Sequence, residues 1–168
     1  MVSLIFLLAV TALLIFLLFI SVKLLGDEEY GVIFHSGSPR GGKRGPGLVF
    51  LTPFVESVTR VDVRPRTTGL TVKEWSPDGT RVEVEVTVRY RVSDPERSVV
   101  AAGDYVRSTE RVVRSALGDL ISRTNADEIA ANVESITTDL RNTANELTSP
   151  WGVEIMGLRV EAVTAEER

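Results

Sequence analysis

The side chains that could carry chemistry are few and widely spaced in this sequence. His35 is the only histidine and there is no cysteine, which excludes disulfides, thiolate metal sites and a cysteine nucleophile. A lone histidine in a strand-like segment is far more often structural than catalytic. A Ser-His-Asp arrangement would have to use His35, yet no nucleophile-elbow sequence accompanies it. We therefore expect no catalytic residue, no metal site and no cofactor.

A Ser-Lys pair and a pair of carboxylates are the two other catalytic arrangements that this sequence could hold. A Ser-Lys pair would draw on Lys23, Lys43 or Lys73, and none of them sits in a recognisable motif. The carboxylates are spread along the chain in the pattern of solvated surfaces, so nothing selects an acid pair. The alternative that stays open is a membrane-tethered hydrolase with an unrecognised active site.

A glycine-rich segment at residues 41–47 holds Lys43 and Arg44 among four glycines. It lacks the spacing of a phosphate-binding P-loop, and strand-like apolar sequence follows it instead of a helix. A flexible connection between strands is the favoured interpretation. If this segment faces a bilayer, Arg40, Lys43 and Arg44 are candidates for contact with anionic lipid headgroups.

The longest apolar run covers residues 4–22, where Thr11 and Ser21 are the only polar side chains. At ~1.5 Å per residue a helix of this length covers about 28 Å, close to the hydrocarbon core of a bilayer. The run exceeds the apolar region of a signal peptide and no basic residue precedes it. We predict an uncleaved transmembrane anchor over residues 1–25. Its membrane-facing positions include Leu4, Phe6, Leu14, Phe16, Phe19 and Val22.

Basic residues lie only on the C-terminal side of this run at close range. Lys23, Arg40, Lys43 and Arg44 follow it within about 20 residues, so the positive-inside rule predicts a single-pass protein with its C-terminal domain in the cytoplasm. Without residues 1–25 the chain keeps 18 of its 19 basic residues against 23 acidic ones. This chain therefore lacks the excess of basic residues that is typical of proteins that bind nucleic acid.

The remaining length suits one globular domain. Its clearest element is residues 81–92, where apolar side chains occupy every even position from 82 and polar ones every odd position, which predicts a strand with one buried face. The Ser-Pro-Asp-Gly turn at residues 76–79 makes it the second arm of a hairpin with residues 70–75. Shorter strands are expected at residues 30–36, 48–51 and 55–64.

Helical signals follow the hairpin. Asp94-Pro95-Glu96 begins a helix, residues 106–122 carry an apolar stripe, and Asn125 with Glu128 forms a capping-box pattern ahead of one longer amphipathic helix. Residues 153–163 then return to a strand, with a change of apolar phase at Met156-Gly157 that indicates a β-bulge. The fold class is α+β.

Several short motifs, in this order and spacing, resemble the stomatin branch of the SPFH (band 7) superfamily, which includes stomatin, prohibitin, flotillin and HflK-HflC. They are EYGV at residues 29–32, RGPGLVF at 44–50, PF at 53–54, VDVR at 61–64, YRVSDPE at 90–96 and PWGV at 150–153. The resemblance implies an N-terminal transmembrane helix followed by one SPFH domain over residues 28–164. That domain would be a twisted, mostly antiparallel sheet packed with amphipathic helices.

The resemblance also implies a function. It points to a non-enzymatic, membrane-anchored scaffold that forms homo-oligomers, organises a patch of membrane lipid and works beside an NfeD-type protein or a membrane protease. In the stomatin pattern a long helical extension follows the domain, so residues 165–168 would be the start of a truncated or absent extension.

Two surfaces were assigned to these roles. The apolar cluster within residues 48–54 suits a core strand as well as a shallow contact with the bilayer interface, which aromatic side chains favour. The family resemblance favours the interface for Phe50 and Phe54, which together with the basic residues of the glycine-rich segment are the membrane-interface candidates. The charged face of residues 81–92 is the candidate for subunit contact, where Glu83 and Glu85 of one copy would meet Arg89 and Arg91 of a neighbour. The two amphipathic helices are expected to use their apolar stripes in the core.

Overall fold

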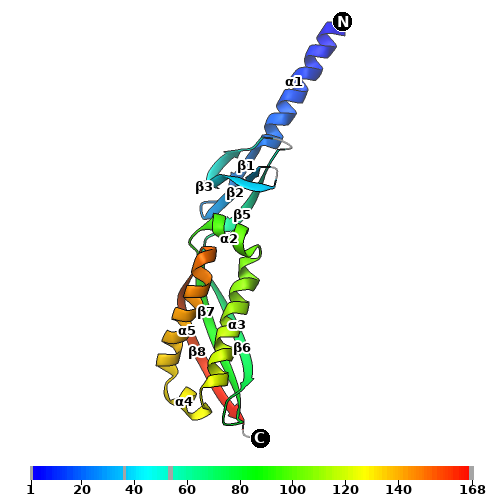
Figure 1. Cartoon of the computed structure of the whole chain (residues 1–168). Coiled ribbons are helices and arrows are strands. Elements are labelled where there is room, and N and C mark those ends of the chain that lie inside the picture. Colours follow the sequence, from blue (N-terminus) through cyan, green and yellow to red (C-terminus); the bar gives the residue numbers. More distant parts are fainter. Residues whose placement is uncertain (1, 36, 53–54, 167–168) are drawn as a thin grey trace. The chain divides into compact units, whose positions relative to one another are not determined.

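The computed structural model describes residues 2–35, 37–52 and 55–166, and the chain divides into two compact units, Met1–Val63 and Arg64–Arg168 (Figure 1). We call them unit 1 and unit 2 and describe each by itself. Unit 1 contains one helix and two small antiparallel sheets, with strand orders β1-β4 and β3-β2-β5. Its elements are α1 (Val2–Ser21), β1 (Val22–Leu25), β2 (Glu29–His35), β3 (Ser38–Arg44), β4 (Gly47–Phe50) and β5 (Glu56–Asp62).

Two boundaries in unit 1 differ from the sequence-based expectation. The helix ends at Ser21, and Val22–Leu25, which we had placed within the anchor, form strand β1. The glycine-rich segment is not a plain connection either, because Ser38–Arg44 forms strand β3 and pairs with β2. Its pairing register shifts between Val32 and Phe34, and Gly42 adopts a positive φ of 63° there. That irregularity removes the alternation by which a strand is recognised.

The core of unit 1 is small. Leu25, Ile33, Val49 and Leu51 are buried together, and Val58 packs against them. The Leu51 N–H donates to the Ser21 carbonyl (2.8 Å), which fastens the end of β4 to the end of α1. A core of this size buries little apolar surface, so much of the apolar sequence of unit 1 is left on its outside.

Unit 2 is a three-stranded antiparallel sheet in the order β6-β7-β8, with helices on one face (Figure 1). Its elements are β6 (Arg66–Trp75), β7 (Arg81–Val92), α2 (Pro95–Ala102), α3 (Tyr105–Arg123), α4 (Ala126–Ala131), α5 (Val133–Thr148), the 3-10 turn η1 (Ser149–Trp151) and β8 (Val153–Glu166). The alternation predicted for β7 is confirmed, because its even residues are buried and its odd ones are exposed or half-buried. The predicted hairpin with β6 is also confirmed.

The core of unit 2 lies between that buried sheet face and the helices. Val82, Val84, Val86 and Val88 meet apolar residues of α3 and α5, among them Val113, Leu117, Ile121, Leu140 and Ala144. The bulge predicted in the closing strand is confirmed, since Arg89 pairs with Gly157 whereas Tyr90 pairs with Ile155, which leaves Met156 as the extra residue. A second register shift occurs between Glu85 and Val86.

The helix expected to run on from Asn125 is broken in two at Asn132, and the Asn125 side chain makes no capping hydrogen bond. The α4 terminus is instead capped from a distance, because the Ala126 N–H donates to Asp78 Oδ2 (2.9 Å). Asp78 Oδ1 also accepts hydrogen bonds from the Ser76 hydroxyl and from the Thr80 N–H. These hydrogen bonds, the Ser76 hydroxyl first, hold the pKa of Asp78 well below its ordinary value.

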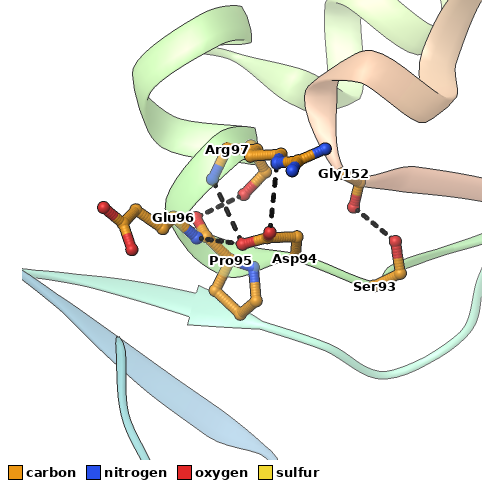
Figure 2. A network of polar contacts seen from close by, with 7 residues as sticks. Ser93, Asp94, Pro95, Glu96, Arg97 and Gly152 are labelled. Atoms are coloured by element: carbon orange, nitrogen blue, oxygen red, sulfur yellow. Dashed lines mark hydrogen bonds and ion pairs between the residues drawn. The ribbon is translucent and has the colours of Figure 1, made fainter. Parts of the chain in front are cut away.

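The two motifs of the second half, YRVSDPE and PWGV, meet in space. The Gly152 carbonyl accepts from the Ser93 N–H (2.8 Å), the Asp94 N–H (3.0 Å) and the Ser93 hydroxyl (3.1 Å). Asp94 Oδ1 in turn accepts from the Glu96 and Arg97 N–H groups at the start of α2, as Figure 2 shows. The network joins the end of β7 to the beginning of β8 and fixes where α2 starts.

The two outer strands of this sheet, β6 and β8, differ in the side chains that hydrogen-bond to their backbones. Arg114 on α3 donates to the Thr71 carbonyl (3.2 Å), so a guanidinium occupies the outward edge of β6 at its middle. On β8 the Asn145 side chain accepts from the Ile155 N–H (3.0 Å) near the start of the strand. The later residues of β8, from Glu161 to Glu166, have no such side-chain hydrogen bond among those described.

Candidate functional site

The strongest candidate for a functional surface is an apolar face on the β1–β4 ribbon. Cross-strand pairing places Val22 opposite Phe50 and Leu24 opposite Leu48, so the four side chains share one face of the ribbon. Leu24, Leu48 and Phe50 are exposed by 67%, 64% and 59%. Apolar side chains at such exposure, gathered on one small face, mark a surface that contacts something other than water.

The same short strands explain why these residues cannot turn inward. Alternation sends Leu25 and Val49 to the core and their neighbours to the opposite face. A one-residue slip of the register would exchange the two sets, and the small core would lose its members. We call Val22, Leu24, Leu48 and Phe50 the ribbon face.

The predicted membrane-interface residues are thus only partly brought together. Phe50 belongs to the ribbon face, and Phe54 lies outside the described residues. Arg44 is exposed at the end of β3, and Arg40 and Lys43 belong to the same strand. Sequence reasoning missed Leu24 and Leu48, although the pairing of two apolar segments on either side of the first hairpin was the signal that could have found them.

The candidate anchor residues fall mainly on α1. Phe6 and Phe16 are exposed by 71% and 61%, and Leu4, Leu14 and Phe19 lie on the same helix. Val22 lies beyond it, as the first residue of β1. Within the part of the chain that the structure describes, no helix meets both the length and the apolarity needed to cross a membrane. The predicted transmembrane helix is therefore not confirmed.

The four subunit-contact candidates lie on the uncovered face of the unit 2 sheet, and two of them are already paired within the chain. Lys73 Nζ lies 2.8 Å from Glu83 Oε2, and Arg91 Nε donates to Glu154 Oε2 (2.9 Å). Glu85 and Arg89 are exposed. The structure therefore divides the four candidates into two that have ion-pair partners on neighbouring strands and two that have none among the described residues.

His35 occupies a solvated position. The strand register places Ser38 and Glu56 on either side of it, but His35 Nδ1 lies 3.9 Å from Glu56 Oε1, too far for a hydrogen bond. Glu56 accepts instead from the Thr52 N–H (2.7 Å), and this hydrogen bond lowers the pKa of Glu56. With the His35 side chain 43% exposed, the row of three side chains lacks the oriented base and water-excluded pocket of a hydrolase.

The described residues contain no cluster of side chains that could bind a metal ion. Across residues 2–35, 37–52 and 55–166, no three histidine, aspartate or glutamate side chains gather in a way that could hold an ion. The geometry therefore directs attention to surfaces and not to a reaction centre.

Comparison with known proteins identifies the family to which this sequence is similar. Residues 24–168 match the model of the "SPFH domain / Band 7 family". The chain is 31% identical over 148 residues to an uncharacterized protein of Archaeoglobus fulgidus, covering 88% of this chain and 59% of that one. It is 29% identical over 144 residues to a stomatin homologue of Pyrococcus horikoshii, covering 85% and 54%.

A mammalian relative shows the same extent of similarity. Stomatin-like protein 1 of Mus musculus is 33% identical over 146 residues, which cover 85% of this chain and 36% of the mouse protein. The matched part of the chain thus spans between about a third and three fifths of the length of these relatives. The matches confirm the resemblance that the short motifs indicated.

Proposed function

The chain belongs to the SPFH domain (Band 7) family, and on that premise we propose that it is a membrane-anchored scaffold whose ribbon face rests in the bilayer interface. In this proposal α1 is a single-pass anchor and unit 2, in the cytoplasm, supports self-association. The observation that carries the proposal is the ribbon face, because it begins at the residue after α1 and three of its four apolar side chains are exposed.

The sequence of α1 supports its role as an anchor. Its 20 residues contain no charged side chain, and the Leu51–Ser21 hydrogen bond fastens the end of β4 to the end of this helix. A helix held in the bilayer would keep the ribbon face within a short distance of the headgroup region. Burying Leu24, Leu48 and Phe50 there would gain about 1–2 kcal/mol for each side chain, given how much of each is exposed.

The basic residues of β3 are compatible with the same placement. Arg40, Lys43 and Arg44 follow one another closely on one strand, and anionic headgroups attract such a group by about 1 kcal/mol for each basic residue. The scaffold would organise the lipid around it and, following the family resemblance, work beside an NfeD-type protein or a membrane protease. No reacting group is needed for this role.

The absence of cysteine makes a direct test practical. A single Leu48→Cys variant of the full chain would carry an environment-sensitive fluorophore in lipid nanodiscs, and Ser57→Cys on exposed β5 would serve as the matched control. We expect the label at position 48 to report an apolar environment and to be quenched by quenchers placed in the lipid. The label at position 57 should report water. Equal, water-like signals at both positions would refute the interfacial role.

Self-association is tested separately, by light scattering of the full chain in mild detergent with correction for bound detergent. We expect a discrete oligomer. A monomer would contradict the self-association part of the proposal and leave the lipid contact standing.

A further inference from the structure

The uncovered face of the unit 2 sheet carries an unusual order of charges along β7. From the turn onward, its outward residues are Glu83, Glu85, Thr87, Arg89 and Arg91. Two acids precede the threonine and two bases follow it at equal spacing. The pattern is therefore antisymmetric about Thr87, since each step away from it meets the opposite charge on the other side.

The two outer charges, Glu83 and Arg91, form ion pairs within the chain, whereas the two inner charges, Glu85 and Arg89, form none among the described residues. Glu83 pairs with Lys73 and Arg91 with Glu154, so each has a partner on a neighbouring strand. Glu85 and Arg89 are exposed and form no ion pair with any residue that the structure describes. Charges left unpaired beside paired neighbours are available for an external partner.

A hollow lies next to Arg89. The strand register puts Gly157 directly opposite Arg89, and a Cβ added to Gly157 would meet nothing within 4 Å. A cleft of about 300 Å³ opens there. It is lined by Thr67, Thr87, Arg89, Gly157, Leu158, Arg159 and Glu161. Arg159, opposite Thr87, is a second exposed guanidinium without an ion-pair partner among the described residues.

A carboxylate suits this hollow. Two guanidinium groups and two threonine hydroxyls offer donors to an anionic oxygen pair, and arginine binds carboxylates through two parallel hydrogen bonds. The position of Glu85 on the same strand identifies which carboxylate. It lies two residues before Thr87, as far from it as Arg89 lies on the other side, about 7 Å at the rise of a strand.

We propose that a second copy of this chain packs face to face on this sheet about a two-fold axis that passes between the two Thr87 residues. The β7 strands then run antiparallel, and Glu85 of each copy enters the hollow beside Arg89 and Arg159 of the other. Such a contact is isologous, because the same patch serves both partners. The inference rests on the self-association proposed above and specifies its surface.

The charge order selects this arrangement over the alternative. If the two β7 strands faced each other in parallel, Glu85 would oppose Glu85 and Arg89 would oppose Arg89, which like-charge repulsion disfavours. In the antiparallel arrangement Glu83 also faces Arg91 across the axis. The two Arg159 side chains come to the same level near the axis, and the Glu85 carboxylates beside them offset that repulsion.

Charge reversal tests the contact on the full chain in detergent. Glu85→Arg and Arg89→Glu should each weaken self-association about tenfold, because each creates two like-charge contacts about the axis. The double variant in one chain restores the two contacts between positions 85 and 89 with reversed polarity but leaves Arg159 unchanged. Its self-association should therefore recover in part and exceed that of either single variant. Arg141→Glu, on exposed α5, makes the same charge change as Arg89→Glu and should have no effect. Single variants that match Arg141→Glu would overturn the proposal.

Crosslinking provides a second, geometric test. A residue on a two-fold axis meets its own copy, so Thr87→Cys should be joined to itself by a short bismaleimide, and Thr71→Cys, exposed on β6 of the same face, should not. Equal crosslinking at both positions, or none at Thr87→Cys in a chain that is oligomeric by light scattering, would overturn this contact and leave the scaffold proposal standing. A monomeric wild-type chain would instead refute the self-association on which the contact rests.

Discussion

The two units of this chain each leave one sheet face uncovered, and the two faces differ in chemistry. On unit 1 the ribbon face consists of aliphatic and aromatic side chains, and three of its four members are exposed by 59% or more. On unit 2 the uncovered face carries threonines and both signs of charge. The interiors differ in the opposite sense, because among the described residues the buried cluster of unit 1 has four members and that of unit 2 has sixteen.

Surface chemistry therefore separates the two units, and from it we infer a different kind of partner for each. Unit 2 places its apolar residues inside and can present charge to another protein, where complementarity sets orientation. Unit 1 has too few buried positions for its apolar residues, so its outside suits a lipid interface. Three experiments test whether the two units differ in this way.

The first concerns the joint that holds unit 2 together. Gly152 has φ 69°, and a Cβ there would lie 2.4 Å from the Asp94 carbonyl oxygen and 2.7 Å from Asp94 Cβ. Gly152→Ala should therefore lower the free energy of unfolding by about 3 kcal/mol, the sum of a left-handed backbone and a steric overlap. Chemical denaturation of the full chain in detergent measures this effect.

Gly79 supplies the matched control, because it also has a positive φ (82°) but open space where its Cβ would be. Gly79→Ala should cost only about 1 kcal/mol. If the division between units holds, Gly152→Ala leaves the lipid signal of a label at position 48 unchanged. A loss of that signal would mean that lipid contact depends on unit 2.

The second prediction removes the apolar character of the ribbon face. Leu48→Ser combined with Phe50→Ser should weaken the lipid contact by about 2 kcal/mol, since both side chains are mostly exposed in the chain itself and gain burial only in the interface. A fluorophore on Leu24→Cys in nanodiscs should then shift toward the signal of water. The thermal stability should stay nearly unchanged, and a marked fall would show that the ribbon face supports the fold and not the membrane contact.

The third and smallest effect is a pH dependence in unit 2. Hydrogen bonds to its carboxylate hold the pKa of folded Asp78 below its unfolded value, so the stabilisation is present above the unfolded pKa and is lost as the pH falls through the folded pKa. Stability should therefore decline below about pH 5. Asp78→Asn should remove its share of that decline, while Asp127→Asn, exposed in the first turn of α4, should change it less. If the free energy of unfolding of wild type and of Asp78→Asn fell equally with decreasing pH, Asp78 would not be the source of the pH dependence.

Much of unit 2 could be predicted from sequence because its signals are local and repeated. The strict alternation of residues 81–92, the Pro-Asp-Gly turn and the change of phase at Met156 each specify one feature, and all three are confirmed. The break at Asn132 and the cap supplied by Asp78 could not be predicted, because the Asp78–Ala126 contact joins residues 48 apart in sequence. Local propensity at Asn125 indicated the helix start correctly and its capping group wrongly.

The strands of unit 1 were harder to predict from sequence, because they also depend on contacts between separate segments. The β3 strand has no alternation to read, since a register shift and a left-handed Gly42 interrupt it, and the ribbon face depends on which two short segments pair. Phe50 was identified by its type alone. Leu24 and Leu48 join it only through the cross-strand register, which single-sequence patterns do not provide.

The Arg114–Thr71 hydrogen bond has a consequence for how the unit 2 sheet could grow. Open-ended strand addition, as in amyloid fibrils, requires two free edges on every molecule, one to receive and one to be received. Here the guanidinium of Arg114 donates to a carbonyl at the middle of β6, while no described side chain hydrogen-bonds to the later part of β8. A strand added at β6 would have to displace Arg114, so edge pairing is favoured at β8, and two molecules joined β8 to β8 would present only obstructed edges to a third.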